Sequence, residues 1–517
     1  MKELVYHRHL LPTAERFADK VAFYDGAYEA TYAQHIDRVA RTAGALRALG
    51  VDASDRFAVM ALNSHQFLEL QHAAFLGAGV VNPLNLRLAP RELAYILADS
   101  GTKVVFTDPY FAKTIDAVRE EAGIEHVVMI GEGDAPHDVQ FEDAIAAATP
   151  VIPDEPDEDD PVVLMYTGGT TGLPKGVLLD HRAEMLNFYH VAMSWRMEDD
   201  VVYLHQTPMF HAASMGGILG IPALGGTSVF LSLFDPARVI ELVEQHSVTM
   251  TVMVPTMIGM MVNHPEYKPE RLSSLRILTY GASPMPTALL EQVLVELPDV
   301  DIYQGYGMTE ASAVLTMLGP QEHRAGGALL KSAGRAVPGV RLSIQDPEGK
   351  PVPTGETGEV CARAGNLMRE YWNKPEATED AFRGGWYHSG DAGYLDENGY
   401  LFLIDRVKDM IVTGGENVYS IEVENAIASH PAVAQVAVIG IPDERWGEAV
   451  HAIVVLHQGH EVTHDDIVSH AREYIAGYKL PKSTEFRVEP LPLSGAMKVL
   501  KRELRDPYWE GKGRAVN

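Results

Sequence analysis

The segment spanning residues 162–179 constrains the fold of this chain most strongly. Residues 162–165 and 177–179 are short apolar runs, rich in β-branched or aliphatic side chains, as is typical of buried strands. The connecting sequence contains glycines, threonines and one lysine. Glycine permits tight turns and lets backbone N–H groups come close to a ligand, and such donors suit the oxygens of a polyphosphate. We therefore predict a phosphate-binding loop between two strands.

This loop is not of the Walker type, because Pro174 precedes Lys175 and Gly176 follows it. The alternative is an ordinary turn, since loops rich in Gly, Thr and Pro are common between strands. The sequence Tyr-Thr-Gly-Gly-Thr-Thr-Gly-Leu-Pro-Lys-Gly-Val resembles the signature loop of the adenylate-forming superfamily. This superfamily contains acyl- and aryl-CoA ligases, luciferases and peptide-synthetase adenylation domains. Serine is commoner where this chain has Gly168, so one hydroxyl donor is missing.

Composition and charge narrow the functional classes. A chain of 517 residues is expected to form two or more domains, and 46% hydrophobic with 22% charged residues is ordinary for a globular protein. A net charge of −29 argues against a nucleic-acid-binding surface. Cys361 is the single cysteine, which excludes an intrachain disulfide and a cysteine-based metal cluster. No apolar run predicts a membrane span and the N-terminus has no signal-peptide pattern, so we expect a cytoplasmic protein.

Strand and helix patterns alternate over the first 305 residues, which predicts parallel sheets covered on both faces. The predicted strands are residues 57–62, 103–107, 201–204, 228–231, 248–252, 276–279 and 301–303. The predicted helices are residues 31–49, 65–78, 236–246, 256–263 and 286–296. Residues 153–161 are acidic and proline-rich, and we expect them to be a solvated linker. Ligands of such sheets bind beyond the carboxyl ends of the strands.

The pattern changes after about residue 340, where turn dipeptides such as Asn398-Gly399 predict hairpins. The last hundred residues predict a small α+β domain. The expected fold is a large α/β domain with doubly wound sheets and a β-rich subdomain, residues 1–405, followed by a small α+β domain, residues 406–517. The family resemblance covers residues 25–506 and implies that the small domain is mobile, with Lys408 at the hinge.

Further segments resemble the family's nucleotide site. Residues 304–310 follow a strand and end in a carboxylate; the alternative is a glycine-rich turn with an exposed glutamate. By resemblance, Tyr306 packs on adenine, Thr309 meets the α-phosphate and Glu310 holds Mg²⁺, a hard cation that takes oxygen ligands. The resemblance also assigns Asp391 and Arg406 to the ribose. The full predicted ATP/AMP site comprises Thr167, Gly168, Gly169, Thr170, Thr171, Gly172, Lys175, Gly281, Ala282, Ser283, Gln304, Gly305, Tyr306, Gly307, Met308, Thr309, Asp391, Arg406 and Lys498.

The C-terminal segment carries the lysine that the resemblance identifies as catalytic, Lys498. Met497 stands where the family usually has glycine, and this departure puts the geometry of the loop in question. An isolated lysine here would be a surface residue on sequence grounds alone, as we expect for Lys501. The family's coenzyme A loop corresponds to Gly414, Gly415 and Glu416, with Ser420 as the expected N-cap of the next helix.

The acid pocket is expected at His211, Met215, Gly216, Tyr280 and Gly305, with His211 also counted as catalytic. Residues 205–224 contain no Asp or Glu. A buried ammonium without a carboxylate partner is strongly disfavoured, so amino-acid substrates are not expected. Small residues in this segment are expected to leave room, and methionines to supply adaptable apolar walls, although each methionine alone is better explained as core.

These features predict an AMP-forming acid–CoA ligase that uses ATP, Mg²⁺ and coenzyme A. Its expected substrate is a lipophilic carboxylic acid, foremost a medium- or long-chain fatty acid. The alternatives are an aryl or cinnamate-type acid–CoA ligase, an acyl-adenylating enzyme that loads a carrier protein, and a luciferase-like oxidase. The oligomeric state is left open, with a homodimer as one alternative.

Overall fold

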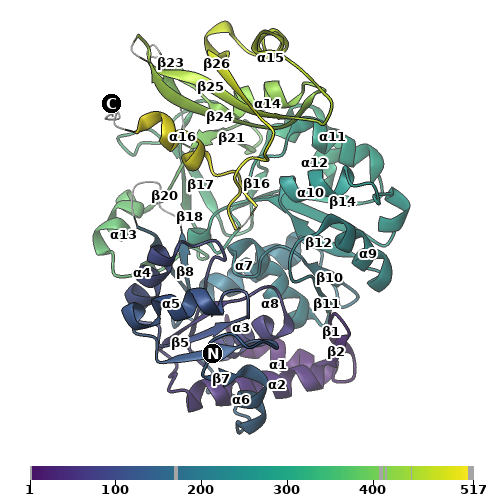
Figure 1. The fold of residues 1–517 in the computed structure, drawn as a ribbon, viewed down its shortest axis with the longest axis vertical. Coiled ribbons are helices and arrows are strands. Elements are labelled where there is room, and N and C mark those ends of the chain that lie inside the picture. Colours follow the sequence, from purple (N-terminus) through teal and green to yellow (C-terminus); the bar gives the residue numbers. More distant parts are fainter. Residues whose placement is uncertain are drawn as a thin grey trace.

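The computed structural model describes residues 3–167, 173–406, 411–413, 416–443, 445–495 and 497–510 (Figure 1). The first large sheet has the strand order β16-β15-β14-β13-β12-β10-β11-β1-β2. Neighbours from β1 through β11, β10, β12 and β13 to β14 are parallel, and β2, β15 and β16 are antiparallel additions. The bounds are β1 (Val21–Asp25), β2 (Tyr28–Thr31), β10 (Val202–His205), β11 (Thr227–Phe230), β12 (Met250–Met253), β13 (Ile277–Gly281), β14 (Asp301–Tyr306), β15 (Thr316–Leu318) and β16 (Arg335–Ala336).

The second large sheet has the order β19-β9-β8-β4-β3-β5-β6-β7. Its strands β8, β4, β3, β5, β6 and β7 pair in parallel, whereas β9 is antiparallel to both β8 and β19. The bounds are β3 (Arg56–Met60), β4 (Val80–Pro83), β5 (Val104–Thr107), β6 (His126–Met129), β7 (Val139–Gln140), β8 (Pro161–Thr167), β9 (Lys175–Asp180) and β19 (Glu370–Tyr371).

Helices cover both faces of each large sheet, which confirms the predicted doubly wound α/β class. One apolar core joins the two sheets through α1 (His7–Arg16), α2 (Tyr32–Ala48), α3 (His65–Phe75), α6 (Phe141–Ala147), α7 (His181–Trp195) and α8 (Met215–Leu224). Separate cores lie under α4 (Pro90–Ser100) and α5 (Ala112–Ala122) on one outer face, and under α9 (Pro236–His246), α10 (Pro255–Val262) and α11 (Thr287–Glu296) on the other.

Local sequence explains where these elements begin and end. Thr31 caps α2, because its hydroxyl accepts a hydrogen bond from Gln34 N at 3.3 Å while Gln34 Oε1 accepts from Thr31 N at 2.8 Å. Gly50 follows the helix with a φ of 81°, a conformation that glycine adopts without strain. The acidic segment before β8 is less free than a solvated linker, since Glu158 Oε1 accepts from the backbone N–H groups of Glu3 and Leu4.

The predicted β-rich subdomain is the antiparallel sheet β17 (Arg341–Gln345), β18 (Gly358–Arg363), β20 (Tyr387–Leu395) and β21 (Leu401–Arg406). Two short helices, α12 (Pro320–Ala325) and α13 (Pro375–Ala381), precede β16 and β20 along the chain. In the region that the structure describes, no helix is long and apolar enough to cross a membrane.

Strands after residue 410 join a separate sheet, made of β22 (Ile411–Thr413), β23 (Glu416–Val418), β24 (Val433–Asp443), β25 (Gly447–Leu456) and β26 (Ser483–Arg487). It carries α14 (Ser420–Ala428), α15 (His464–Ala471) and α16 (Lys501–Trp509). Figure 1 shows the yellow segment before α16 descending from this sheet toward the large domain.

Two local predictions in this part of the chain are wrong. The N-cap of α14 is Tyr419, and the Ser420 hydroxyl instead accepts a hydrogen bond from Lys501 Nζ at 2.6 Å. Lys501 is accordingly no free surface lysine, because it also pairs with Glu424 at 2.7 Å.

Candidate active site

The predicted phosphate loop connects the two strands of an antiparallel hairpin. Thr167 at the end of β8 pairs with Lys175 at the start of β9, so the loop begins and ends at one point. Gly168, Gly169, Thr170, Thr171 and Gly172 lie outside the described residues. The Lys175 ammonium lies 4.8 Å from the centre of the Tyr371 ring, a cation–π contact.

Tyr371 links this lysine to the predicted magnesium ligand. It lies on β19, opposite Val177 of β9, and its hydroxyl donates a hydrogen bond to Glu310 Oε1 at 2.9 Å. Burial raises the pKa of the Tyr371 phenol, and the charge of Glu310 raises it further, so the hydroxyl stays a donor. Sequence reasoning missed this residue, because a Tyr-Trp pair in a polar stretch does not distinguish packing from function.

The predicted adenine and ribose residues contact each other. Tyr306 ends β14, and its hydroxyl donates to Asp391 Oδ2 of β20 at 2.8 Å. Burial raises the pKa of the neighbouring Tyr387, and the charges of Glu310 and Asp391 add to the effect. Arg406 is the cross-strand partner of Asp391 in the sheet register, but its side chain lies outside the described residues. The charges of Glu310 and Asp391 thus both act on one buried phenol.

The ends of β13 and β14 lie side by side, with Gly281 opposite Gly305 and Tyr280 opposite Gln304. A Cβ on Gly281 would lie 2.4 Å from Gly305 O, so this close approach requires glycine. The next residue, Ala282, has a φ of 65°, an uncommon conformation for a residue with a side chain. Strained backbone of this kind often accompanies ligand sites, and Ser283 follows directly.

The chain after β14 is a tight turn that positions Thr309 and Glu310. A Cβ on Gly307 would lie 2.0 Å from Ala313 O, which explains the glycine. Met308 packs against the apolar cores, and Thr309 begins the 3₁₀ turn η3 (Thr309–Ala311). Asn366, which sequence reasoning also missed, holds this turn with hydrogen bonds of 2.8 Å from its amide to Ala311 O and Val314 O.

His211 follows β10 and begins the short 3₁₀ turn η1 (Ala212–Ser214), where its Nδ1 accepts a hydrogen bond from Ala213 N at 3.2 Å. Burial lowers the pKa of His211 to about 3, and the positive charge of Lys498 contributes to the same effect. The imidazole is therefore neutral at pH 7. The charge of Lys498, on the small domain, thus acts on a residue of the predicted acid pocket.

The other predicted pocket residues fall into two groups. Met215 is fully buried in the core. A Cβ on Gly216 would lie 3.0 Å from the Val191 side chain of α7, so no space is left beside this glycine. Gly217 likewise faces Tyr203, so the room expected at these two glycines is absent and their role is close helix packing.

The second group of predicted pocket residues, Tyr280 of β13 and Gly305 of β14, leaves more room for a ligand. A Cβ on Gly305 would meet nothing within 4 Å, so open space lies in front of this residue. Tyr280 is 1% exposed, and its hydroxyl is 3.1 Å from both Gln304 Oε1 and His323 Nε2. These two contacts fix the ring at the end of β13.

Lys498 lies in a tight hairpin that is closed by a bridge between Leu493 and Val499. Ser494 N donates to Lys498 O at 2.7 Å, and Lys498 N donates to Ser494 Oγ at 3.1 Å. Met497 adopts a φ of 61°, the left-handed conformation expected of the glycine that is usual at this position. The loop therefore keeps a glycine-like backbone despite the methionine.

We call residues 493–499 the lysine hairpin, and it docks against the large domain. The Arg87 guanidinium donates to Leu493 O, and a Cβ on Gly495 would lie 2.2 Å from Asn85 Oδ1 and 3.0 Å from the Phe210 ring. Phe210 directly precedes His211. Sequence patterns gave no sign of the docking residues Asn85 and Arg87, which belong to a loop more than four hundred residues earlier in the chain.

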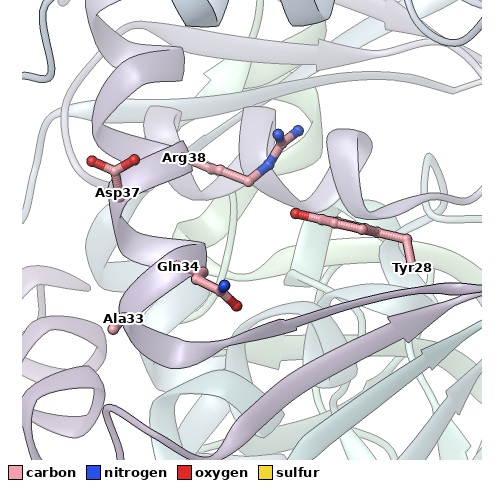
Figure 2. Close-up of a pocket in the computed structure, with 5 residues that line it drawn as sticks. All are labelled: Tyr28, Ala33, Gln34, Asp37 and Arg38. Carbon is pink, nitrogen blue, oxygen red and sulfur yellow. The ribbon is translucent and has the colours of Figure 1, made fainter.

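The remaining predicted residues cannot be placed. Lys408, Gly414 and Gly415 lie outside the described residues, as does the side chain of Glu416. A surface hollow elsewhere is lined by Tyr28 and by residues of α2, namely Ala33, Gln34, Asp37 and Arg38 (Figure 2). Its cation is already engaged, because Arg38 pairs with Glu69 at 2.6 Å and with Glu142 at 2.8 Å. None of the predicted ligand-binding residues lines this hollow.

Comparisons with known proteins identify the family to which this chain belongs. The AMP-binding enzyme family matches residues 11–372, and the AMP-binding enzyme C-terminal domain matches residues 422–498. A feruloyl-CoA synthase from Amycolatopsis is 41% identical over 93% of this chain and 94% of its own length. The long-chain-fatty-acid–CoA ligase FadD13 from Mycobacterium tuberculosis is 38% identical over 92% and 93%.

A solved structure extends the similarity to the fold. ATP-bound MatB from Rhodopseudomonas palustris superposes with a TM-score of 0.87 at 30% identity, covering 98% of this chain and 99% of MatB. The match extends over both the large and the small domain, and the curated relatives are matched over nearly their whole length. The chain belongs to the AMP-binding enzyme family and is an AMP-forming acid–CoA ligase.

Proposed function

We propose that this ligase activates a lipophilic carboxylic acid, foremost a medium- or long-chain fatty acid, to an acyl-AMP and then to its coenzyme A thioester. The observation that carries the proposal is the docked lysine hairpin: Gly495 approaches Phe210, the residue before His211, and the charge of Lys498 acts on His211. The contacts Lys175–Tyr371–Glu310 and Tyr306–Asp391 supply nucleotide-binding groups from the large domain.

The class of carboxylic acid is inferred from the charges in the segment predicted to line the acid pocket. Residues 205–224 carry no carboxylate, and the neutral His211 does not replace one as a partner for an ammonium group. We assign Met209 after β10, Met253 of β12 and Met257 of α10, all buried, to the apolar walls of the acid site, because methionine adapts to flexible apolar chains. The 38% identity to a long-chain-fatty-acid–CoA ligase supports a fatty acid.

An aryl acid is the second candidate. The 41% identity to a feruloyl-CoA synthase supports it. A panel of acids separates the two candidates.

For ATP we propose the roles that the resemblance implies. The loop of residues 167–175 holds the β- and γ-phosphates, Thr309 meets the α-phosphate, and Tyr306 packs on adenine. Asp391 and Arg406 bind the ribose. Asp391 accepts one hydrogen bond from Tyr306 on Oδ2, and a carboxylate has further acceptor positions for ribose hydroxyls.

Glu310 has the chemistry required of the proposed Mg²⁺ ligand. Its carboxylate is a hard oxygen donor, and the hydrogen bond from Tyr371 to Oε1, the one side-chain bond that the described residues give it, leaves acceptor positions for a cation. Bound Mg²⁺ would neutralise part of the triphosphate charge. Tyr371 orients the carboxylate and, through its ring, the Lys175 ammonium.

In the first half-reaction, a carboxylate oxygen of the acid bonds to the α-phosphorus, and the bond from that phosphorus to the bridging oxygen breaks to release pyrophosphate. Both reactants are anions, so the protein must neutralise charge and align the attack. We assign this role to Lys498, which bridges the carboxylate and the α-phosphate. The neutral His211 lines the acid side without adding a second positive charge.

In the second half-reaction, the coenzyme A sulfur bonds to the acyl carbonyl carbon, the thiol loses its proton and AMP leaves. We propose that residues 406–517 rotate at Lys408 between the two steps, because one small domain cannot present both Lys498 and the loop of Gly414, Gly415 and Glu416 to one point. The sheet topology supports this boundary, because β21 belongs to the sheet of β17, β18 and β20, whereas β22 belongs to the sheet of the small domain.

The test is pyrophosphate release from ATP and Mg²⁺ with a panel of fatty acids, hydroxycinnamic and benzoic acids, and amino acids. Each acid is assayed with and without coenzyme A, and the thioester is identified by mass spectrometry. We expect the largest kcat/KM for a fatty acid of about eight or more carbons. A preference for hydroxycinnamic acids would favour the aryl candidate, and turnover of amino acids would overturn the charge argument.

A further inference from the structure

Three side chains of different ligand types meet between β18 and β20, outside the catalytic residues assigned above. Cys361 and His388 are cross-strand partners, with Sγ 3.3 Å from Nδ1. Glu359, two residues before Cys361, has its Oε2 2.8 Å from the same Nδ1. The three ligand atoms all lie within 4.8 Å of one another. A sulfur, an imidazole nitrogen and a carboxylate oxygen therefore surround one point.

This cluster is built into the protein. Cys361 is fully buried, and the side chains of His388 and Glu359 are 4% and 20% exposed. The carboxylate is held by Gly390 N at 3.0 Å to Oε1 and by the Arg383 guanidinium at 2.7 Å to Oε2. Partners of this kind orient the ligands of metal sites in proteins.

His388 is held with its Nδ1 toward the other two ligand atoms. Its Nε2 is 3.2 Å from Arg383 O. Its Nδ1 is 2.8 Å from Glu359 Oε2 and 3.3 Å from Cys361 Sγ. The imidazole nitrogen therefore faces the same point as the carboxylate and the sulfur.

We propose that Glu359, Cys361 and His388 bind a divalent transition-metal ion of the zinc type. The donor set of one sulfur, one nitrogen and one oxygen matches Zn²⁺ in a tetrahedral site whose fourth position is water. Mg²⁺ and Ca²⁺ prefer oxygen ligands throughout, so this site is distinct from the one proposed at Glu310.

Binding exchanges protons for the metal. Burial raises the pKa of the Cys361 thiol to about 12, so the thiol is protonated without metal. When the metal–sulfur bond forms, the S–H bond breaks and its proton leaves to solvent. Occupancy must therefore rise with pH.

The metal would stabilise the antiparallel pair of β18 and β20 rather than take part in turnover. Glu359 also holds the N–H of Gly390, the residue before Asp391. An ion bound to Glu359, Cys361 and His388 would link the two strands at the segment that leads to Asp391. We expect Zn²⁺ to raise the midpoint of thermal unfolding by several degrees.

Cobalt(II) tests the site directly, because Cys361 is the only cysteine of the chain. The full-length protein is incubated with excess Co²⁺ at pH 8 and its absorption spectrum recorded. We expect a near-ultraviolet thiolate-to-cobalt band that saturates at one Co²⁺ per chain and is displaced by Zn²⁺. The Cys361→Ser variant should lack the band, and His388→Gln should weaken it at least tenfold. His457→Gln, which removes an exposed histidine of another segment, should retain it.

Thermal unfolding with Zn²⁺ gives an independent readout. The midpoint should rise for the wild type and for His457→Gln but not for Cys361→Ser, whose folding is checked by its unshifted midpoint without metal. A wild-type spectrum without the thiolate band overturns the proposal. An equal Zn²⁺ shift in Cys361→Ser also overturns it, because the metal would then bind elsewhere.

Discussion

Replacing Gly495 by alanine separates the two half-reactions by steric means. The added Cβ would lie 2.2 Å from Asn85 Oδ1 and 3.0 Å from the Phe210 ring when the lysine hairpin is docked. Asn85 Oδ1 is held by Arg87 N at 3.0 Å, and Phe210 is 6% exposed, so neither neighbour moves freely. The φ of Gly495 lies outside the left-handed region, so alanine adds no backbone strain of its own.

Overpacking of this kind costs about 1–3 kcal/mol. The cost applies only to the docked state, which we assign to adenylation, because Asn85 and Phe210 belong to the large domain. At about 1.4 kcal/mol per factor of ten, adenylation should slow by about 5-fold to 150-fold. Thioester formation from supplied acyl-AMP should change less than about twofold, since that step uses the other domain arrangement.

Single-turnover measurements check both numbers: pyrophosphate release for adenylation, and thioester formation from synthetic acyl-AMP. Gly477→Ala is the matched control, because a Cβ there meets nothing within 4 Å. Asn85→Ala in the Gly495→Ala background should restore part of the rate by removing Oδ1. Equal slowing of both half-reactions, or an unchanged adenylation rate, would refute the assignment of the docked hairpin to adenylation.

Three other substitutions test neighbouring parts of the account. Lys498→Ala should lower adenylation by at least about a thousandfold while thioester formation from supplied acyl-AMP survives, as measured by the same two assays; equal loss in both would contradict the assigned role. Met497→Val places a β-branched residue at a φ of 61°, so adenylation should fall about tenfold, whereas Met497→Gly should retain it. Burial raises the pKa of Glu184 from 4.5 to about 8. The folded state therefore keeps a proton that the unfolded state loses, and stability falls as pH rises through this window. In the wild type this effect lowers the free energy of unfolding by up to about 1.4 kcal/mol per pH unit. Glu184→Gln should lack this decrease, as measured by urea unfolding at pH 5 and pH 8. The same pH dependence in both proteins would contradict the prediction.

Sequence patterns predicted the large-domain fold well, because its signals are local. Apolar periodicity and the glycine stop at Gly50 predicted α2 to within one residue at each end, and the predicted bounds of β3 and α9 lie within two residues of the observed ones. The exceptions have physical causes. Ser420 was expected to cap α14, but its hydroxyl accepts from Lys501, a residue 81 positions away that no local pattern reports.

The candidate site residues likewise divide into those that a local motif predicted and those that only the fold brings together. Motifs pointed to Lys175, Tyr306, Glu310 and Asp391, and the structure joins them in two groups, Lys175–Tyr371–Glu310 and Tyr306–Asp391. Tyr371, Asn85 and Arg87 were missed, because their contacts depend on the packing of distant segments. The glycines after His211 were misjudged as open space, since a glycine in sequence does not say whether Val191 or Tyr203 fills the gap.

Several expectations stay predictions: the cytoplasmic location, the homodimer, the hinge at Lys408 and the coenzyme A loop. The most direct measurement of the central claim is a crystal structure with ATP and Mg²⁺. The account predicts adenine against Tyr306, ribose at Asp391 and the triphosphate along residues 167–175, within reach of Lys498. A nucleotide bound outside the region between β8–β9 and the end of β14 would contradict it.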